Sequence, residues 1–429
     1  MKKENATNFV FKNKVLSFES RIYEFKSEIY DDFDKESKKI GLQSKIDDLF
    51  NGEKVNNSEE LAAWHPKYRN EYSQVKDKIY FDELFNSATN IVIIGIGGSY
   101  EGPKLLIESI GCKSSNYIFI TGSDKEEFNE KTKKLIPNET IFIVSSKSFT
   151  TKETIETLND AISWSKDIKK FIAITANKTE ALKYNIQNII EFDKEIGGRY
   201  SIWSDISLPA EWENKIELKD KFIQGGKQAD LDLNNNDEYL KFVKTLAFSD
   251  IWLHNYKNIK ARAVLSYIWK FRSFPDYVQQ LEMESLGKQP SKDSLYKKTG
   301  QIIFGGYGPK AQHSYFQLLH QGTHNISADI IMHDGDIKSL LYAQATTQSK
   351  LLSCGANDSL NQQEKINGNV PTNLFMLNKI DSYSLGYLIA TWEHRTYITA
   401  SMLGINPFDQ FGVSAGKIFT EKYLLENGG

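Results

Sequence analysis

The stretch Asn90-Ile-Val-Ile-Ile-Gly-Ile-Gly-Gly-Ser99 joins a short run of β-branched residues to a glycine-rich loop. The apolar run shows no alternation with polar residues, which is typical of a parallel strand buried on both faces. A helical pattern follows over residues 103–110. A buried strand, a glycine-rich turn and a helix form the first part of a strand–helix–strand unit, so this stretch predicts an α/β fold.

The same pattern continues on the C-terminal side of this stretch. Further apolar runs occupy residues 117–120, 140–144, 171–175 and 189–192, with helical sequences between them, as over 152–167. Strands that alternate with helices indicate a doubly wound parallel sheet. We therefore predict a first α/β domain over residues 71–212.

A second series of strands and helices follows. Helices are expected over residues 237–257, 274–285, 311–322 and 337–354, and strands over 261–269, 301–304, 326–333 and 372–380. This series predicts a second doubly wound α/β domain over residues 213–405. Helices over 383–404 and 411–425 end the chain, and we assign residues 406–429 to a C-terminal helical segment.

The N-terminal part of the chain differs in character. Residues 1–70 are rich in charge and contain no apolar run of the kind seen in the expected strands. Weak amphipathic patterns over residues 18–25 and 46–50 indicate short helices. We therefore predict an N-terminal helical arm in front of the two α/β domains.

The composition narrows the class of protein. The 429 residues include 53 basic and 56 acidic side chains, so the chain lacks the excess of positive charge that favours nucleic-acid binding. Its two cysteines, Cys112 and Cys354, suit a reducing compartment and form no zinc-binding pattern. The first residues lack the apolar core of a signal peptide, and no window approaches the ~20 apolar residues of a membrane span. We expect a cytoplasmic protein without nucleic-acid or membrane partners.

The loop over residues 95–102 has the features of an anion site. Glycines let the backbone approach a ligand closely, and the N-terminus of the following helix offers free N–H groups. A dinucleotide fingerprint would need glycine where Tyr100 stands, and the Lys-Ser/Thr ending of a P-loop is missing. The alternative is a tight turn that holds no ligand.

A second loop strengthens the case for a phosphate. Residues 145–151 carry five hydroxyl groups around Lys147, again between a buried strand and a helix. Phosphate oxygens accept hydrogen bonds from hydroxyl, backbone N–H and ammonium groups. One hydroxyl would be enough to cap the helix. Two such loops on neighbouring strands predict one phosphomonoester site at the carboxyl edge of the sheet.

Seven motifs, in order along the chain, resemble those of the glucose-6-phosphate isomerase (phosphoglucose isomerase) family. They are Gly95-Ile-Gly-Gly-Ser99, Ser146-Lys-Ser-Phe-Thr-Thr-Lys-Glu-Thr154, Gly197-Gly-Arg-Tyr-Ser-Ile-Trp-Ser204, Gln280-Leu-Glu-Met-Glu-Ser-Leu-Gly-Lys288, Gln312-His313 with Gln317-Leu-Leu-His-Gln-Gly-Thr323, Gly368-Asn-Val-Pro-Thr-Asn373 and Asn406-Pro-Phe-Asp-Gln-Phe-Gly-Val-Ser-Ala-Gly-Lys417. The resemblance implies two sugar-isomerase α/β domains and a homodimer with active sites near the subunit interface.

The resemblance also implies roles for individual residues. Contacts to the phosphate fall to Ser99, Ser146, Lys147, Ser148 and Thr151, further substrate contacts to Gly98, Arg199, Gln280 and Gln410, and catalysis to Glu284, His313 and Lys417. Some positions depart from the family pattern, namely residues 305–311, Ser148, Leu286 and Val370. None of the departures falls on Glu284, His313 or Lys417. We therefore expect them to affect the shape of the pocket and the range of substrates more than the type of reaction.

The chemistry of the reaction fits these residue types. An aldose and a ketose interconvert when one base moves a proton between C2 and C1, and Glu284 is the candidate base. Arg199 would stabilise the negative charge of the cis-enediolate. Ring opening needs proton exchange near neutral pH, which suits His313 with help from Lys417. The scheme needs no metal or other cofactor.

Alternatives stay open at this point. In isolation, each of these side chains is more often structural or solvated than catalytic, and we interpret His320 as structural while leaving His333 undecided. The departure over residues 305–311 leaves room for mannose 6-phosphate as a second substrate. A sugar-phosphate sensor without catalytic activity could be built on the same fold.

Overall fold

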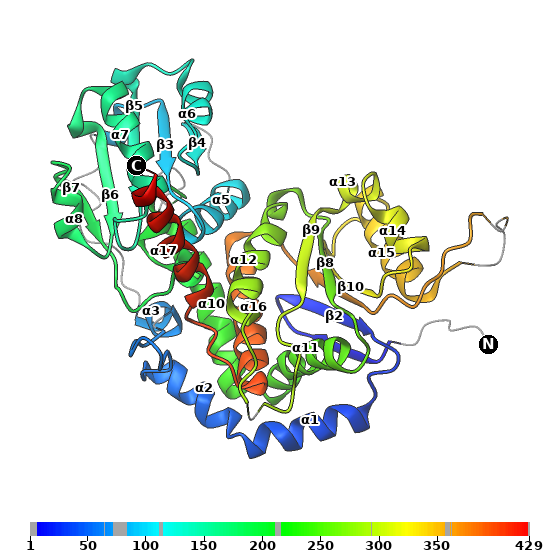
Figure 1. Cartoon of the computed structure of the whole chain (residues 1–429). Helices are drawn as coiled ribbons and strands as arrows, with labels where there is room; N and C mark the ends of the chain where they lie inside the picture. The colour runs from blue at the N-terminus through cyan, green and yellow to red at the C-terminus, as the bar shows by residue number, and fades with distance from the viewer. Residues whose placement is uncertain are drawn as a thin grey trace.

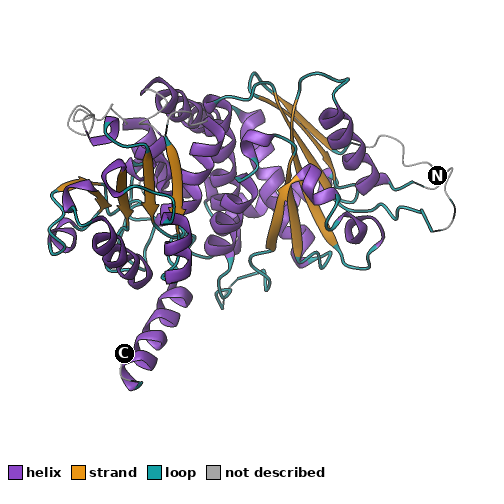
Figure 2. Cartoon of the chain, turned by 90° about the horizontal axis from the view of Figure 1, so that it is seen from above, coloured by secondary structure: helices purple, strands orange, loops and turns teal. Residues whose placement is uncertain are grey.

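The computed structural model describes residues 7–63, 65–71, 84–110, 115–210, 216–292, 294–356, 361 and 363–427. Two sheets lie on opposite sides of a layer of helices (Figures 1 and 2). Five strands between residues 90 and 191 form the first sheet, and six strands from residues 9–21 and 261–377 form the second. The predicted α/β class with two parallel-rich sheets is confirmed.

The first sheet is parallel throughout. Its strands, in the order β4-β3-β5-β6-β7, are β4 (Asn116–Ile120), β3 (Asn90–Ile94), β5 (Thr140–Ser145), β6 (Phe171–Thr175) and β7 (Asn188–Glu191). The central strands β3, β5 and β6 are almost wholly buried, as their unbroken apolar runs predict. The helices between them are α5 (Gly98–Ile110), α6 (Lys125–Thr132), α7 (Lys152–Ser165) and α8 (Lys178–Leu182). The strand order reverses between β3 and β5, where doubly wound sheets bind ligands.

The second sheet repeats this topology in its parallel part. Its strands β9 (Ile302–Tyr307), β8 (Ala261–Ser266), β10 (Ile326–His333) and β11 (Thr372–Leu377) lie in the order β9-β8-β10-β11. This order matches β4-β3-β5-β6 strand for strand, so β8 and β10 flank the second switch point. All nine parallel strands of the described residues correspond to predicted ones, with boundaries that shift by a few residues.

The prediction for the N-terminal part is wrong in one respect. Strands β1 (Phe9–Lys12) and β2 (Leu16–Arg21) form an antiparallel hairpin, and β2 also pairs antiparallel with β11. A helix expected over residues 18–25 therefore begins as a strand. The apolar side chain of Phe18 packs against Phe242 and Phe375 in the core. Strand β2 has only six residues, too few for its alternation to stand out among the charged ones.

Helices complete the N-terminal part. They are α1 (Ser27–Lys39), α2 (Leu42–Asn51) and α3 (His65–Glu71). The helix expected over residues 46–50 is confirmed by α2. In Figure 1, α1 and α2 run along the base of the molecule below the central helices.

The central helical layer consists mainly of α10 (Ile216–Asn235), α11 (Asp237–Asn255), α12 (Phe274–Leu286) and α16 (Ser382–Leu403). Helix α10 was absent from the sequence prediction, because glycines at 225 and 226 disfavour a helix. The structure explains one of them: a Cβ on Gly225 would lie 1.9 Å from the Tyr383 carbonyl of α16. Buried Arg69 of α3 ties the layer together through Asp230 of α10 and Glu393 of α16.

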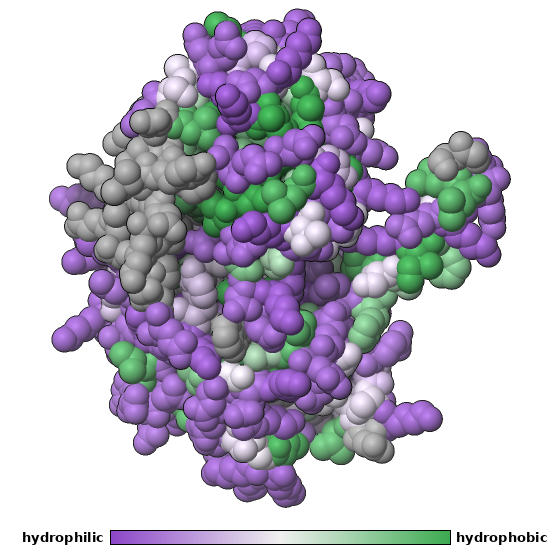
Figure 3. All heavy atoms as spheres, turned by 90° about the vertical axis from the view of Figure 1, so that its left-hand side faces the viewer, coloured by the Kyte–Doolittle hydropathy of each residue, from purple (hydrophilic) through white to green (hydrophobic). Residues whose placement is uncertain are grey.

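The remaining helices come from the second half of the chain. They are α13 (Gly308–Gln312), α14 (Phe316–Gln321), α15 (Leu340–Cys354) and α17 (Phe411–Glu426). The single helix expected over residues 311–322 is thus two short helices that break at His313. Helix α17 projects from the body and buries none of its residues (Figures 2 and 3). Among the residues that the structure describes, no helix has the length and apolar character needed to cross a bilayer.

Candidate functional site

The turn from β3 to α5 lies against a second glycine turn. A Cβ on Gly98 would lie 2.0 Å from the carbonyl oxygen of Gly198, so only glycine allows these two backbones to touch. Gly97 has a φ of +60° and faces the side-chain amide of Gln280. The contact brings the first glycine-rich loop beside the residue that follows Gly198, which is Arg199.

The turn from β5 to α7 is held in shape by its own hydroxyls. The Ser146 hydroxyl accepts a hydrogen bond from the Phe149 amide at 3.1 Å and lies 3.2 Å from the Thr151 hydroxyl. Phe149 takes a left-handed φ of 54°, and its buried ring anchors the turn. The backbone of Lys147 bonds to the amide of Ala176 after β6. These contacts fix a tight loop whose side chains line a cavity.

Lys147 is the basic residue of this loop. Burial lowers the pKa of its ammonium group, and the nearby positive charge of Arg199 acts in the same direction, while carboxylates such as that of Glu59 act against it. A partly desolvated cation of this kind gains strongly from an anionic ligand.

Helix α12 presents a carboxylate to the same cavity. Glu284 Oε2 lies 3.2 Å from Arg199 Nη1 and accepts a hydrogen bond from Gln280 Nε2 at 3.3 Å. The Glu284 side chain is 25% exposed, whereas that of Arg199 is 2% exposed. A carboxylate open to the cavity and a buried guanidinium therefore lie side by side.

Arg199 is held rigidly by groups from two parts of the chain, α12 and residues 407–410. Its Nε donates to the Ser285 hydroxyl at 2.8 Å, and its Nη1 donates to the Gln410 side-chain oxygen at 2.8 Å. Its Nη2 donates to the main-chain oxygens of Pro407 and Asp409. With its other donors occupied in this way, the guanidinium is a fixed positive charge on one wall of the cavity.

The cavity has a volume of about 350 Å³. Its lining includes the predicted residues Gly98, Ser99, Ser146, Lys147, Thr151, Arg199, Gln280, Glu284, Gln410 and Lys417. Lys417 enters from the exposed helix α17 and Gln410 from the residue before it. The structure thus brings together residues from both α/β halves and the C-terminal helix.

Two predicted residues lie outside this lining. Ser148 is exposed and its hydroxyl accepts hydrogen bonds from the amide and hydroxyl of Thr150. His313 is exposed at the C-terminal end of α13, after strand β9 of the second sheet. The roles given to these two residues stay predictions.

Several lining residues were not singled out from the sequence. Glu153 and Thr154 in the first turn of α7, and Val413 in α17, complete the wall. The buried Ser145 hydroxyl has no hydrogen-bond partner among the described residues. These residues lie inside or next to the motifs, so the motif boundaries are the signal that could have found them.

The positions that depart from the family pattern lie away from the cavity, apart from Ser148 beside it. Leu286 is buried at the end of α12, Val370 packs against the core of the second sheet, and residues 305–311 form the end of β9 and α13. A Cβ on Gly305 would lie 1.8 Å from the Val264 carbonyl, which gives this glycine a packing role.

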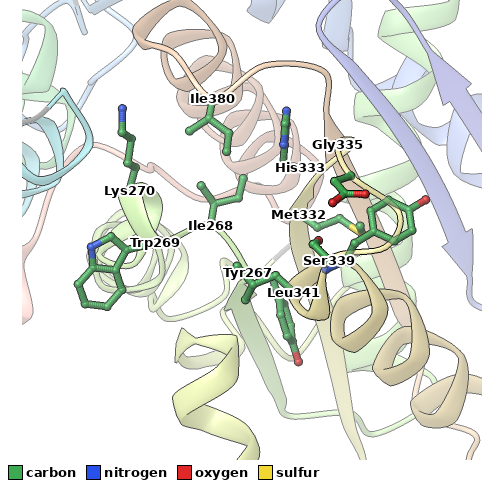
Figure 4. A pocket seen from close by; sticks show the side chains of 12 residues that line it. Tyr267, Ile268, Trp269, Lys270, Met332, His333, Gly335, Ser339, Leu341 and Ile380 are labelled. Carbon is green, nitrogen blue, oxygen red and sulfur yellow. Dashed lines mark hydrogen bonds between the residues drawn. The ribbon is translucent and has the colours of Figure 1, made fainter.

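A second cavity, of about 390 Å³, lies at the carboxyl ends of β8 and β10 (Figure 4). Its walls are mostly aromatic and aliphatic, with Tyr267, Ile268, Trp269, Met332, Leu341 and Ile380 among them. Lys270, His333, Asp336 and Ser339 are its main polar side chains. It occupies the position in the second sheet that the candidate site occupies in the first, but it lacks a hydroxyl-rich loop.

His320 of α14, which we interpret as structural, has its ring Nε2 2.9 Å from the side-chain oxygen of Gln348 in α15. Burial lowers its pKa. Within the described residues, no group of three or more His, Cys, Asp or Glu side chains is placed to hold a metal ion.

Fold and site together define an α/β protein with two parallel-rich sheets and a polar cavity at the edge of one of them. Solved structures share this fold. A glucose-6-phosphate isomerase from Chlamydia trachomatis matches with a TM-score of 0.86 at 22% identity, over 98% of this chain and 90% of that one. A hypothetical protein from Thermus thermophilus matches with a TM-score of 0.74 at 20% identity, over 95% of this chain and 99% of that one.

Sequence comparison is more specific. The model of the phosphoglucose isomerase family matches residues 79–427. A glucose-6-phosphate isomerase of Legionella pneumophila (strain Paris) is 34% identical over 413 residues, which cover 88% of this chain and 83% of the relative. One from Marinomonas sp. (strain MWYL1) is 31% identical over 450 residues, covering 89% and 82%. The chain belongs to the phosphoglucose isomerase family.

Proposed function

We propose that this protein interconverts glucose 6-phosphate and fructose 6-phosphate. The observation that carries the proposal is the pair formed by the accessible Glu284 carboxylate and the buried Arg199 guanidinium, 3.2 Å apart. The pair faces two loops rich in N–H and hydroxyl donors across one cavity. Relatives at 31–34% identity that carry the name glucose-6-phosphate isomerase support the same substrate.

The phosphate of the substrate would bind at the first-sheet loops. Ser99, Ser146, Thr151 and Lys147 converge there, and the positive ends of the α5 and α7 dipoles point to these loops. Hydrogen bonds between charged groups and a phosphate are stronger than neutral ones, so this subsite supplies most of the binding. The sugar then extends toward α12.

The proton transfer would occur beside α12. Glu284 removes the C2 proton of the open-chain aldose and returns it to C1, and a proton passes from the C2 hydroxyl to the C1 oxygen. Arg199 stabilises the negative charge that develops on the enediolate oxygens. The Gln280 amide donates to Glu284, which keeps the carboxylate oriented toward the cavity. Arg199 is held by the chain before substrate arrives, so little reorganisation is needed.

Ring opening requires a proton at the ring oxygen and the removal of one from the C1 hydroxyl. Lys417 lines the cavity and can act at the sugar ring. His313 lies outside the cavity of its own chain, so we propose that it serves the cavity of a second copy in a homodimer. Helix α17 supports a dimer because its apolar side chains are uncovered, among them Phe411, Val413, Ile418, Phe419, Tyr423 and Leu425.

A coupled assay that follows fructose 6-phosphate formation tests the proposal. We expect wild-type turnover, and in Glu284→Gln a fall in kcat of about 1,000-fold or more, because the amide cannot accept the proton. The matched control is Asp276→Asn on the same helix, whose carboxylate is half exposed and pairs with Lys104. Near-normal turnover of Glu284→Gln, or none in the wild type, contradicts the proposal.

A further inference from the structure

Residues 404–410, between α16 and α17, supply Gln410 to the cavity and set the direction of the helix that carries Lys417. Two hollows of about 470 and 580 Å³ border this segment, and both are lined by Gly404, Ile405 and Asn406. A segment next to open space is not held in place by close packing alone. Phe408 of this segment packs against Tyr200 and Tyr397, and polar contacts add to this anchoring.

The strongest of these contacts comes from Lys288, which follows the C-cap glycine of α12. Its Nζ lies 2.9 Å from Asp409 Oδ1 and also donates to the Asp409 main-chain oxygen. The two side chains are 16% and 11% exposed. An ion pair this shielded from water interacts more strongly than a surface pair.

The contact is shared with Arg199. The main-chain oxygen of Asp409 that binds Lys288 also accepts a hydrogen bond from Arg199 Nη2 at 2.9 Å, and the next residue, Gln410, binds Nη1. The second carboxylate oxygen of Asp409 accepts a hydrogen bond from the Ser58 hydroxyl at 2.8 Å. Asp409 thus joins α12, the N-terminal segment and the charged wall of the cavity.

We propose that Lys288 and Asp409 form a positioning pair that holds Gln410 and Arg199 in the geometry that the enediolate requires. Neither residue lines the cavity, so the pair acts through Arg199 and Gln410. Loss of Lys288 leaves a mostly buried carboxylate with one hydroxyl partner, and the segment moves to let water reach it. The inference rests on the proposed isomerase function.

The kinetic test compares Lys288→Met with Lys292→Met, an exposed lysine a few residues further on. We expect kcat of Lys288→Met to fall about 100-fold, which is the order of loss for a small misplacement of catalytic groups. The phosphate loops belong to the first sheet and stay in place, so KM should change little. Lys288→Arg keeps the charge and should recover most of the loss, whereas Lys292→Met should match the wild type.

A binding test separates positioning from general damage. Inorganic phosphate should inhibit Lys288→Met and wild type alike, whereas a phosphorylated sugar acid, which mimics the enediolate, should bind the variant more weakly by calorimetry. Equal affinity for the sugar acid, or a parallel loss of phosphate binding and thermal stability, overturns the inference. A wild type that binds the sugar acid but turns over no substrate contradicts the proposed function instead.

Discussion

The loops after β3 and β5 of the first sheet carry glycines, hydroxyl groups and Lys147 around a polar cavity. After β8 and β10 of the second sheet, Tyr267, Trp269 and, in the first turn of α15, Leu341 line a mostly apolar one (Figure 4). Both pairs of strands flank the switch point of a sheet with the same strand order. The two sheets therefore offer equivalent positions for a ligand, one at each switch point, and the loops decide what each position can bind.

Side chains alone do not account for the difference between the edges. At the first edge, the glycine turn contacts backbone atoms of a distant segment, Gly198 and Arg199. At the second, a Cβ on Gly335 would meet only the ring of His333, a side chain that can rotate. Backbone packing therefore excludes a side chain at Gly98 of the first edge, whereas a movable side chain faces Gly335 of the second.

The largest expected effect comes from a substitution at Gly98 of the first edge. In Gly98→Ala the new methyl group would lie 2.0 Å from the Gly198 oxygen, so both loops must separate. We expect a loss of about 1–3 kcal/mol of stability from overpacking and a fall in kcat/KM of about 100-fold or more from the displaced site. Steady-state kinetics and thermal unfolding measure the two effects.

The matched variant at the second edge is Gly335→Ala. It should keep near wild-type activity and melting temperature, because the His333 ring can turn away. Comparable damage from the two substitutions would show that the two edges do not differ in this way.

The second comparison sets Lys147 against Lys270, the basic residue of the apolar cavity. Loss of a charge-assisted contact to phosphate costs about 1.5–3 kcal/mol, so Lys147→Gln should raise KM about 10- to 100-fold. Lys270→Gln should leave KM within about twofold of the wild type, in line with an exposed charge. An equal rise in both variants would indicate that the sugar phosphate uses the second edge.

The pH dependence of kcat/KM sharpens this comparison. Burial lowers the pKa of Lys147, so in the free protein its positive charge is lost as pH rises through a value below that of an ordinary lysine. We expect kcat/KM to fall along this alkaline limb. The arginine of Lys147→Arg stays charged, so in this variant the fall in kcat/KM should begin at a higher pH. A fall at the same pH as in the wild type would show that another group causes it.

The sequence predicted the parallel strands of both sheets well, since short apolar runs rich in β-branched and aromatic residues, such as that of β5, favour buried strands. The glycines and hydroxyl groups of the first-edge loops also stood out in the sequence, and most of them line one cavity. The hairpin of β1 and β2 was missed because its pairing partner, β11, is hundreds of residues away. Helix α10 was missed because its glycines serve a contact with α16.

The candidate site also has features that the sequence indicated and features that it did not. Most of the motif residues line one cavity, with Ser148 and His313 outside it. The contacts that orient Arg199 were not foreseen, because Ser285, Pro407 and Asp409 bind it through a hydroxyl and main-chain oxygens. Main-chain acceptors leave no mark in composition or spacing. The placement of His313 outside the cavity also depends on three-dimensional arrangement alone.

The smallest expected effect lies where the two halves meet, at α5 and α12. Burial raises the pKa of Glu101 in α5 to about 7, and its neighbours are Lys104 and Glu108 of α5 and Asp276 of α12, with the two carboxylates adding to the rise and the lysine opposing it. A carboxyl group with a raised folded-state pKa holds its proton longer in the folded than in the unfolded chain. Stability therefore falls as pH rises from about 4.5 to about 7 and then stays lower.

Replacement of Glu101 by glutamine, a neutral side chain of similar shape, removes the stability loss caused by the buried charge. Glu101→Gln should raise the melting temperature at pH 8, where the wild-type carboxylate is charged and desolvated, and leave it nearly unchanged at pH 5, where most of it is protonated. Glu130→Gln, an exposed position on α6, serves as the control and should have little effect at either pH. An equal shift of Glu101→Gln at both pH values would show that packing between α5 and α12, rather than the charge of Glu101, limits stability where the halves meet.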